Sequence, residues 1–215
     1  MPEARDRATK RKRLKEQRET QILDAAARVF ARKGYERATT REIASEAGLS
    51  EGTIYNYFDS KRHLLIAMAV RLALDSLQEL DSLPPMEDEQ AHVTALITNR
   101  FELLLSNLDL VRALMPQILV DDDLRQEYMT KVLSPAISYL GEYLKKREVA
   151  GAFRKVKADF VARAMIGAVM SFGFLWLQQP SDLDERSRDE LVSEMVGLFL
   201  DGLRVRPSEQ KDRQS

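Results

Sequence analysis

Residues 39–58 read TTREIASEAGLSEGTIYNYF, and this stretch decides the fold of the N-terminal part of the chain. Thr39 or Thr40 can cap a first short helix. Gly48 ends that helix, because glycine adopts a positive φ at little energetic cost, and Ser50 can cap a second short helix. The stretch therefore predicts two short helices joined by a tight turn.

The apolar residues of the same stretch predict how the two helices pack. Ala44 has a small side chain at the point where the two helices must cross closely. Leu49 is the apolar residue of the turn, and its side chain should pack between the two helices. Ile54 and Phe58 anchor the second helix. This spacing is typical of a helix-turn-helix unit, whose second helix is free to enter a DNA major groove.

Further helices are expected on both sides of this unit. From Glu19 the apolar residues follow one face of a helix of about sixteen residues, which Gly34 terminates. Residues 1–18 are rich in basic residues and contain almost no large apolar side chains, so we expect a disordered basic tail there. Ser60 can cap a longer helix that continues to about Leu80.

The rest of the chain has the composition and periodicity of helices. Leu and Ala together number 51, against 21 for Val and Ile, and no alternating strand pattern is long enough to compete. Pro116 and Pro135 should kink or divide the helices that contain them. The acidic triplet at residues 121–123 predicts a loop with a helix cap. Further breaks between helices are expected at Gly151 and Pro180. The periodic stretches cover residues 89–106, 109–120, 123–147, 158–178 and 185–204. We therefore predict an all-α protein.

Charge is divided unevenly along the chain. Residues 1–63 carry fifteen Lys and Arg and ten Asp and Glu, a net charge of +5, whereas the remaining residues carry a net charge of −6. Either the N-terminal part meets a polyanion, or the asymmetry is random variation of the surface.

Several classes of function are excluded or disfavoured by what the chain lacks. It contains no cysteine, which excludes disulfides, thiolate metal sites and cysteine nucleophiles, and its two histidines are isolated. We therefore expect no metal site, no cofactor and no catalytic residue. The longest nearly apolar run, residues 164–177, spans 14 residues, fewer than the roughly 18 that a membrane helix needs, so we expect a cytoplasmic protein.

The N-terminal motif resembles the DNA-binding module of the TetR family of bacterial transcriptional repressors. The resemblance covers about residues 19–66 and implies a TetR-type helix-turn-helix domain there, a helical ligand-binding and dimerisation domain at residues 67–206 and a polar tail at 207–215. Arg62 and His63 depart from the family pattern, in which an acidic residue often follows the lysine. The residues that carry the resemblance are Gly34-Tyr35, Thr39-Thr40, Ile43-Ala44, Ala47-Gly48-Leu49-Ser50, Gly52-Thr53-Ile54-Tyr55, Tyr57-Phe58 and Ser60-Lys61.

Roles in phosphate contact follow for several of these residues. Gly52 and Thr53 open the second helix, where free backbone N–H groups and the positive end of the helix dipole favour a phosphate. Tyr55 and Tyr57 point to different sides of the helix. Each either offers its hydroxyl to a phosphate or its ring to a thymine methyl group, or packs as an ordinary core residue. Lys61 resembles the phosphate-binding lysine of the family.

Base readout is expected from the middle of the second helix. Asn56 either pairs with adenine through two hydrogen bonds or is a plain exposed polar residue, and Arg41 or Glu51 could add readout from the flanks. Thr40 completes the set of residues expected at the DNA. Residues 10–13, Lys-Arg-Lys-Arg, form either a solvated run or an arm that follows DNA phosphates or enters the minor groove.

Specific DNA binding by one short helix needs two copies about 34 to 36 Å apart, so we expect the C-terminal part to form a homodimer. The predicted interface uses the last two helices, whose apolar stripes could otherwise cover the core of a single subunit. It comprises the small residues Ala164, Gly167, Ala168 and Ser171 and the apolar residues Leu191, Met195, Leu198, Phe199 and Leu203.

Other large apolar residues of the C-terminal part either fill its core or line a cavity for a hydrophobic or aromatic small molecule. Such an effector would shift the dimer away from the form that matches a palindromic operator, and so release the DNA. The candidate lining residues are Phe101, Leu105, Met115, Tyr139, Tyr143, Met165, Val169, Phe172 and Trp176.

Two other classes of function compete with a ligand-responsive DNA-binding repressor. An enzyme could use Asp121, Asp122 and Glu127, but no nucleophile, glycine-rich phosphate loop or metal-ligand spacing accompanies these carboxylates. A helical interaction module could use the helix-turn-helix unit to bind a protein partner. That function does not explain Gly52 and Thr53, which suit a phosphate at the start of the second helix. The sequence therefore favours the repressor.

Overall fold

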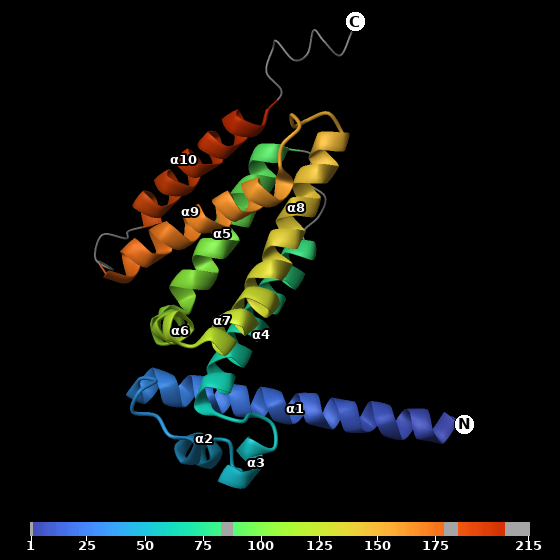
Figure 1. The fold of residues 1–215 in the computed structure, drawn as a ribbon, viewed down its shortest axis with the longest axis vertical. Coiled ribbons are helices and arrows are strands. Elements are labelled where there is room, and N and C mark those ends of the chain that lie inside the picture. Colours follow the sequence, from blue (N-terminus) through green and yellow to red (C-terminus); the bar gives the residue numbers. More distant parts are fainter. Residues whose placement is uncertain (1, 83–87, 179–184, 205–215) are drawn as a thin grey trace, which may run out of the picture. The chain divides into compact units, whose positions relative to one another are not determined.

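The computed structural model describes residues 2–82, 88–178 and 185–204. In these ranges the chain forms the helices α1 to α10 and a short π-helical segment, and no β-strand (Figure 1). The prediction of an all-α protein is thus confirmed. The predicted break at Pro180 and the predicted tail at 207–215 lie outside the described residues.

The chain divides into two compact units, each of which is built from two segments. Residues 1–71 and 109–128 form the first unit, and residues 72–108 and 129–215 form the second. The sequence predicts other bounds, with a basic tail at 1–18, a DNA-binding domain at 19–66, a ligand-binding and dimerisation domain at 67–206 and a polar tail at 207–215. The difference arises because residues 109–128 pack with the N-terminal segment, where Asp121 forms an ion pair with Arg62.

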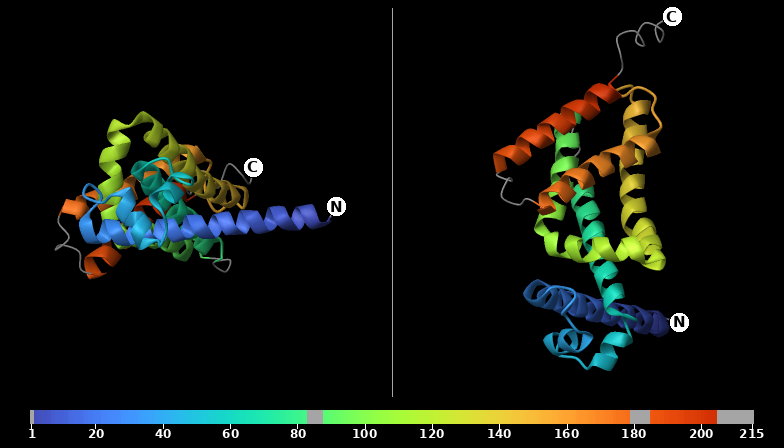
Figure 2. Two further views of the ribbon diagram at one scale, coloured as in Figure 1. Left: turned by 90° about the horizontal axis from the view of Figure 1, so that it is seen from below. Right: turned by 60° about the vertical axis from the view of Figure 1, so that its left-hand side comes forward.

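Helix α1 (Pro2–Lys33) is much longer than the predicted helix, because it also includes residues that we expected to be a disordered tail. Its N-terminal half has no glycine and carries ion pairs at i,i+4 spacing, with 3.7 Å between Lys12 and Glu16. Side chains of residues 9–17 are exposed. Figures 1 and 2 show this half of α1 extending beyond α2 and α3.

The C-terminal half of α1 has an apolar face and packs against α2 (Thr40–Glu46), which in turn packs against α3 (Glu51–Tyr55). An ion pair between Arg71 and Asp24 joins α4 (Lys61–Asp81) to α1. The core of this unit contains the fully buried side chains of Ile22, Ala25, Ile43, Ile54, Leu64 and Leu65. Burial of these large aliphatic side chains stabilises the unit by about 1.5–3 kcal/mol for each one that is removed from water. The predicted helix-turn-helix is therefore held on a core that α1 and α4 complete.

Two further helices of the first unit come from later in the chain. Helix α6 (Leu108–Val120) contains Pro116, which does not divide the helix. Before α7 (Asp122–Tyr128), the carboxylate of Asp121 accepts a hydrogen bond of 3.0 Å from the backbone N–H of Leu124. The predicted helix cap is thus present at Asp121, but the predicted loop is not, because Asp122 and Asp123 already belong to α7.

The predicted stretch 123–147 divides in the structure before Pro135. A π-helical segment (Met129–Leu133) precedes α8 (Ser134–Val149). Proline has no N–H to donate into the helix before it, and the hydroxyl of Ser134 donates to the carbonyl of Met129 over 2.9 Å. Gly151, with a φ of 78°, follows the end of α8.

The second unit is a bundle of α8, the C-terminal part of α4, α5 (Glu89–Ser106), α9 (Ala158–Gln178) and α10 (Glu185–Leu203). Helix α9 packs against α5 and α8, and α10 packs against α5. Its largest fully buried side chains are Phe101, Phe153, Leu144, Leu200 and Val93. This core fixes the helices that surround the cavity described below.

Candidate nucleic-acid interface and apolar cavity

Caps and a turn position the exposed helix α3. A capping box begins α2, in which the N–H of Glu42 donates to the hydroxyl of Thr39 and the N–H of Thr39 donates to the carboxylate of Glu42, each over 3.2 Å. Gly48 then takes a φ of 66° in the turn. The hydroxyl of Ser50 accepts from the N–H of Thr53 over 3.2 Å and so caps α3. All three local signals read from the sequence therefore act as predicted.

Most of the residues predicted to contact DNA lie at the surface of this unit. Arg41, Gly52, Tyr55 and Asn56 are exposed, whereas Thr40, Glu51, Thr53, Tyr57 and Lys61 are half-buried. Ile54 turns to the opposite side and is fully buried. Helix α3 therefore presents polar groups and a bare backbone to solvent while one apolar residue anchors it.

A hydrogen-bonded trio joins the start of α2 to α3. The hydroxyl of Thr40 donates to the carboxylate of Glu51 over 2.6 Å and lies 3.1 Å from the hydroxyl of Tyr55, whose side chain is 49% exposed. These contacts fix the side chains of Glu51 and Tyr55 before any ligand arrives. Hydrogen-bonding groups that are already held in place favour specific recognition, because little side-chain entropy is lost when a ligand binds.

Gly52 has no evident reason within the subunit to be glycine. Its φ is not positive, and a Cβ placed on it would meet no atom within 4 Å. Glycine in a helix is less stable than alanine by about 1 kcal/mol. A bare backbone at an exposed first turn of a helix allows close approach of another molecule, such as a phosphate group.

Lys61 has partners within the protein that the sequence did not reveal. Its ammonium donates to the carbonyl oxygens of Tyr35, Glu36 and Ala38 over 2.7, 3.2 and 3.1 Å. It also lies 4.3 Å from the centre of the Tyr35 ring. Lys61 thus ties the start of α4 to the loop between α1 and α2, whereas the resemblance implied a phosphate contact.

Ion pairs join α1 to α2. The carboxylate of Glu46 accepts from Arg28 over 2.7 Å and from Arg32 over 2.6 Å, and Glu42 pairs with Lys33. Hydrogen bonds from Arg32 and Arg28 lower the pKa of Glu46 below its ordinary value. In the described part of the chain Arg41 forms no ion pair, so its positive charge is available to a ligand.

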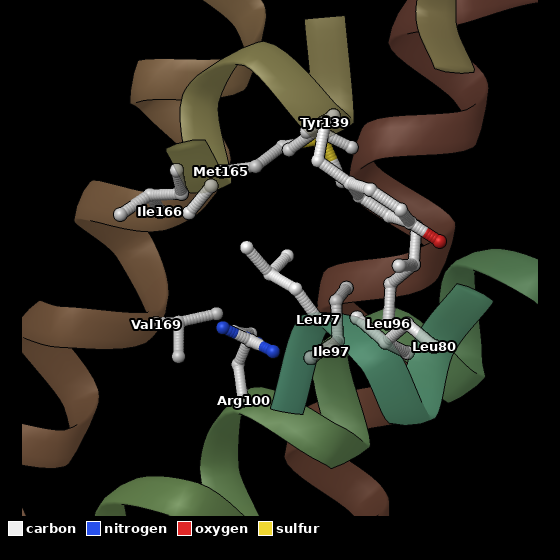
Figure 3. Close-up of a pocket in the computed structure, with 11 residues that line it drawn as sticks. Leu77, Leu80, Leu96, Ile97, Arg100, Tyr139, Met165, Ile166 and Val169 are labelled. Carbon is white, nitrogen blue, oxygen red and sulfur yellow. The ribbon is translucent and has the colours of Figure 1, made fainter. Parts of the chain in front are cut away.

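A narrow apolar cavity lies in the second unit, between α4, α5, α8 and α9 (Figure 3). Its empty space is about 440 Å³, including the open mouth. Of the candidate lining residues, Tyr139, Met165 and Val169 do line it. The sequence analysis missed Leu77, Leu80, Leu96, Ile97, Arg100, Ala136, Leu140 and Ile166. Helical periodicity marks these positions as inward-facing but does not say which of them face a void.

The other cavity candidates lie elsewhere. Phe101 is fully buried in the core, and Tyr143 stacks on His92 with ring centres 4.3 Å apart. Burial raises the pKa of Tyr143 to about 12. Met115 belongs to α6 in the first unit, Leu105 and Phe172 do not line the cavity, and the side chain of Trp176 lies outside the described residues.

Helix α9 presents an exposed stripe that includes part of the predicted interface. Ala164, Gly167 and Ser171 are exposed, and the stripe ends in Phe160 and Phe174, whose side chains are 70% and 52% exposed. These five positions recur at spacings of three and four residues and so share one face of the helix.

Helix α10 contributes fewer exposed residues than predicted. Leu198 is 74% exposed, and Leu191 and Phe199 are half-buried, as is Ala168 of α9. Met195 and Leu203 are buried in the core, because the stripe read from the sequence is wider than the face that points outward.

The described residues contain neither a cluster of metal ligands nor a single helix that could cross a membrane. No group of three His, Asp or Glu side chains in these ranges could hold a metal ion. No single helix there is long and apolar enough to cross a membrane, and only the bent pair α5 and α6 passes the length and composition test together.

Comparison with known proteins identifies the helix-turn-helix unit. Residues 22–68 match the family described as bacterial regulatory proteins, tetR family. The HTH-type transcriptional repressor KstR of Rhodococcus jostii (strain RHA1) is 28% identical over 187 residues, which cover 84% of this chain and 82% of that protein. The fatty acid metabolism regulator protein of Bacillus subtilis (strain 168) is 26% identical over 184 residues, or 82% of this chain and 92% of that protein.

A solved structure extends the similarity of the fold to both units. The transcriptional regulator FadR from Bacillus subtilis, in complex with stearoyl-CoA, aligns with a TM-score of 0.68 at 21% identity and covers 85% of this chain and 98% of that one. These relatives are transcriptional regulators, a class without enzymatic activity. On the motif and these relatives, residues 22–68 match the DNA-binding domain of the TetR family of bacterial regulatory proteins, and the longer alignments are with transcriptional regulators.

Proposed function

We propose that the protein is a homodimeric repressor that binds a palindromic operator through α3 and releases it when an apolar small molecule enters the cavity. The observation that carries DNA recognition is the exposed edge of α3, where Asn56 and the Thr40–Glu51–Tyr55 trio lie next to the bare backbone of Gly52. Phosphates and base edges are the groups that such an edge suits.

Dimerisation is supported by the stripe of α9. Two exposed phenyl rings enclose a run of small side chains, Ala164, Gly167 and Ser171, and a second copy of the stripe could approach closely over that run. An exposed apolar face of this kind is typical of a protein interface.

The effector is inferred from the cavity and from the relatives. The lining is apolar except at Arg100 and the hydroxyl of Tyr139, which suits an aliphatic or aromatic molecule. The relative named as a fatty acid metabolism regulator, and the stearoyl-CoA in the similar structure, favour an effector with a long acyl chain.

An electrophoretic shift with DNA fragments from upstream of the gene, with heparin as competitor, tests the proposed DNA binding. We expect a specific shift and protection of an inverted repeat in a footprint. If Asn56 reads a base, N56A should lower operator affinity by about 1–3 kcal/mol for each half-site and leave non-specific affinity unchanged.

The matched control for N56A is Q90A, an exposed amide on α5 in the second unit, which should leave both affinities unchanged. Absence of any heparin-resistant shift would instead favour a helix-turn-helix that binds a protein partner. Equal loss of specific and non-specific affinity in N56A would remove Asn56 from base readout.

A further inference from the structure

Arg100 is the one charged residue among those that line the cavity. It projects from α5, and Figure 3 shows its guanidinium group directed into the space near Leu77 and Val169. Burial lowers the pKa of Arg100, although an arginine stays protonated at neutral pH. A full positive charge is therefore present in an otherwise apolar cavity.

The hydrogen-bond partners of this guanidinium are neutral. Its Nε and Nη2 donate to the side-chain oxygen of Asn99 over 3.2 and 2.8 Å, and Nη2 also donates to the hydroxyl of Ser76. The Ser76 hydroxyl in turn donates to the same Asn99 oxygen over 2.6 Å. The carboxylate of Glu79 accepts from the amide of Asn99 over 3.4 Å and acts electrostatically to raise the pKa of Arg100, but no described carboxylate forms an ion pair with Arg100.

Arg100 is half-buried and has no ion-pair partner among the described residues. A partly buried charge without an ion pair is unfavourable, and an anion is the partner that relieves this most effectively. The neutral oxygens of Asn99 and Ser76 satisfy some guanidinium donors without neutralising the charge. Leu77 and Val169 supply apolar walls next to the same group. The arrangement combines one cationic end with a hydrophobic channel.

We propose that the cavity binds amphipathic anions, in which an aliphatic chain lies among the apolar side chains and an anionic oxygen pairs with Arg100. The anionic oxygen can belong to the carboxylate of a free fatty acid or to a phosphate of an acyl thioester. This inference rests on the proposed effector cavity and adds to it the chemistry of the ligand head.

Pairing with the anion would also alter a contact between two helices. Arg100 of α5 donates a hydrogen bond to the hydroxyl of Ser76 on α4. The anion of the ligand would compete with that hydroxyl for the same guanidinium donor. A ligand without an anionic head leaves this contact in place. Arg100 would therefore distinguish effectors from other apolar molecules that fit the cavity.

The test is isothermal titration calorimetry on the full-length protein without DNA. Three ligands with the same chain length are compared, dodecanoic acid, dodecanoyl-CoA and dodecan-1-ol. We expect at least one of the two anions to bind about 10-fold or more tightly than the alcohol, since a charge-assisted pair contributes about 1.5–3 kcal/mol. R100Q should remove that preference, and R100K should retain most of it.

R163Q is the matched control, because Arg163 is an exposed arginine of α9 that pairs with Asp159 on the surface. It should keep the anion preference of the wild type. A preference for the acid assigns a carboxylate to Arg100, and a preference for the thioester alone, lost in R100Q, assigns a phosphate.

Equal affinity of the wild type for acid, thioester and alcohol, or no binding of any of the three, would overturn the inference. So would an undiminished preference in folded R100Q. The comparison of the three ligands on the wild type shows whether anions are preferred, even if R100Q does not fold. Because no DNA is present, failure of operator binding would count only against the proposed function.

Discussion

Lys61 shows how the surroundings of a side chain can change the role that its sequence motif suggests. Its three N–H donors all reach carbonyl oxygens between α1 and α2, at the loop that leads into the helix-turn-helix. The side chain thereby completes hydrogen bonds for carbonyl groups after the end of α1. Its first effect is on the placement of α2 and α3, whatever those helices bind.

K61M should therefore destabilise the first unit. Methionine cannot donate the hydrogen bonds that the ammonium of Lys61 makes, so three backbone carbonyl groups lose this partner. We expect the free energy of unfolding to fall by about 2 kcal/mol. Thermal and urea unfolding measure the change. The control R41M, which removes an exposed arginine without an ion pair, should change stability by less than about 0.5 kcal/mol. Equal stability of K61M and the wild type would contradict the assigned role.

The salt dependence of DNA binding separates this role from direct phosphate contact. Because the ammonium donors of Lys61 are already used, we expect the slope of log affinity against log salt to be the same for K61M and the wild type below their melting temperatures. A slope smaller by about two charges for the dimer would instead place Lys61 at the phosphates.

Glu46 gives a pH dependence whose sign follows from its pKa. Arg32 and Arg28 lower the pKa of Glu46 in the folded state, so the ionised carboxylate stabilises the fold above the ordinary value of 4.5. That contribution is lost as the pH falls through the lowered folded pKa. E46Q should be less stable than the wild type at neutral pH, and the difference should disappear in acid. Urea unfolding at several pH values measures it, and a constant difference would contradict the assignment.

Among the helices, α9 has two faces with different chemistry. Met165 and Val169 face the cavity, whereas Ala164 and Gly167 face outward between the exposed phenyl rings. One helix thus supplies both a wall of the cavity and the proposed subunit contact. The stripe of small residues leaves little room for a large charged side chain between two subunits.

G167R should convert the proposed dimer into a monomer and abolish operator binding. The arginine prevents close approach of two α9 helices and leaves a charge without a partner at the contact. Light scattering coupled to gel filtration measures the mass, and circular dichroism confirms the fold. S138R, an equal change at an exposed position of α8, should remain a dimer. A dimeric G167R would locate the interface elsewhere.

Local signals explain why some elements were predicted well. The Ser50 cap, the positive φ of Gly48 and the buried Ile54 act within a few residues, so α2, α3 and their turn could be read from the sequence. For residues 2–18 the sequence predicts disorder, because this segment has almost no large apolar side chains that could pack into a core. The structure makes them helical, with ion pairs along the helix such as Lys12–Glu16.

Arg100 could not be recognised as a cavity residue from the sequence. It lies between the buried residues Ile97 and Phe101, and in a helix this position reads equally as an exposed charge at the edge of an apolar face. Its role depends on Leu77, Tyr139 and Val169, which other helices bring to it. Contacts between distant segments decide the site, and no short-range pattern records them.

For the protein as a whole, the proposed mechanism requires that the effector and the operator oppose each other by the same factor. If an acyl effector weakens operator binding, operator DNA must weaken effector binding equally, by about 5- to 150-fold for typical couplings. Fluorescence anisotropy of labelled operator gives one factor, and calorimetry of the effector with and without operator gives the other. A change in operator affinity without the reciprocal change would contradict a two-state shift.

The exposed phenyl rings of Phe160 and Phe174 have a consequence for gene dosage. If the active species is a pair of chains, then at low expression, where most chains are single, the number of active pairs grows with the square of the amount synthesised. Halving transcription of the gene would then cut operator occupancy by about fourfold in that regime, by simple mass action. A regulator built in this way turns a modest change in its own supply into a steeper change in the promoters that it controls.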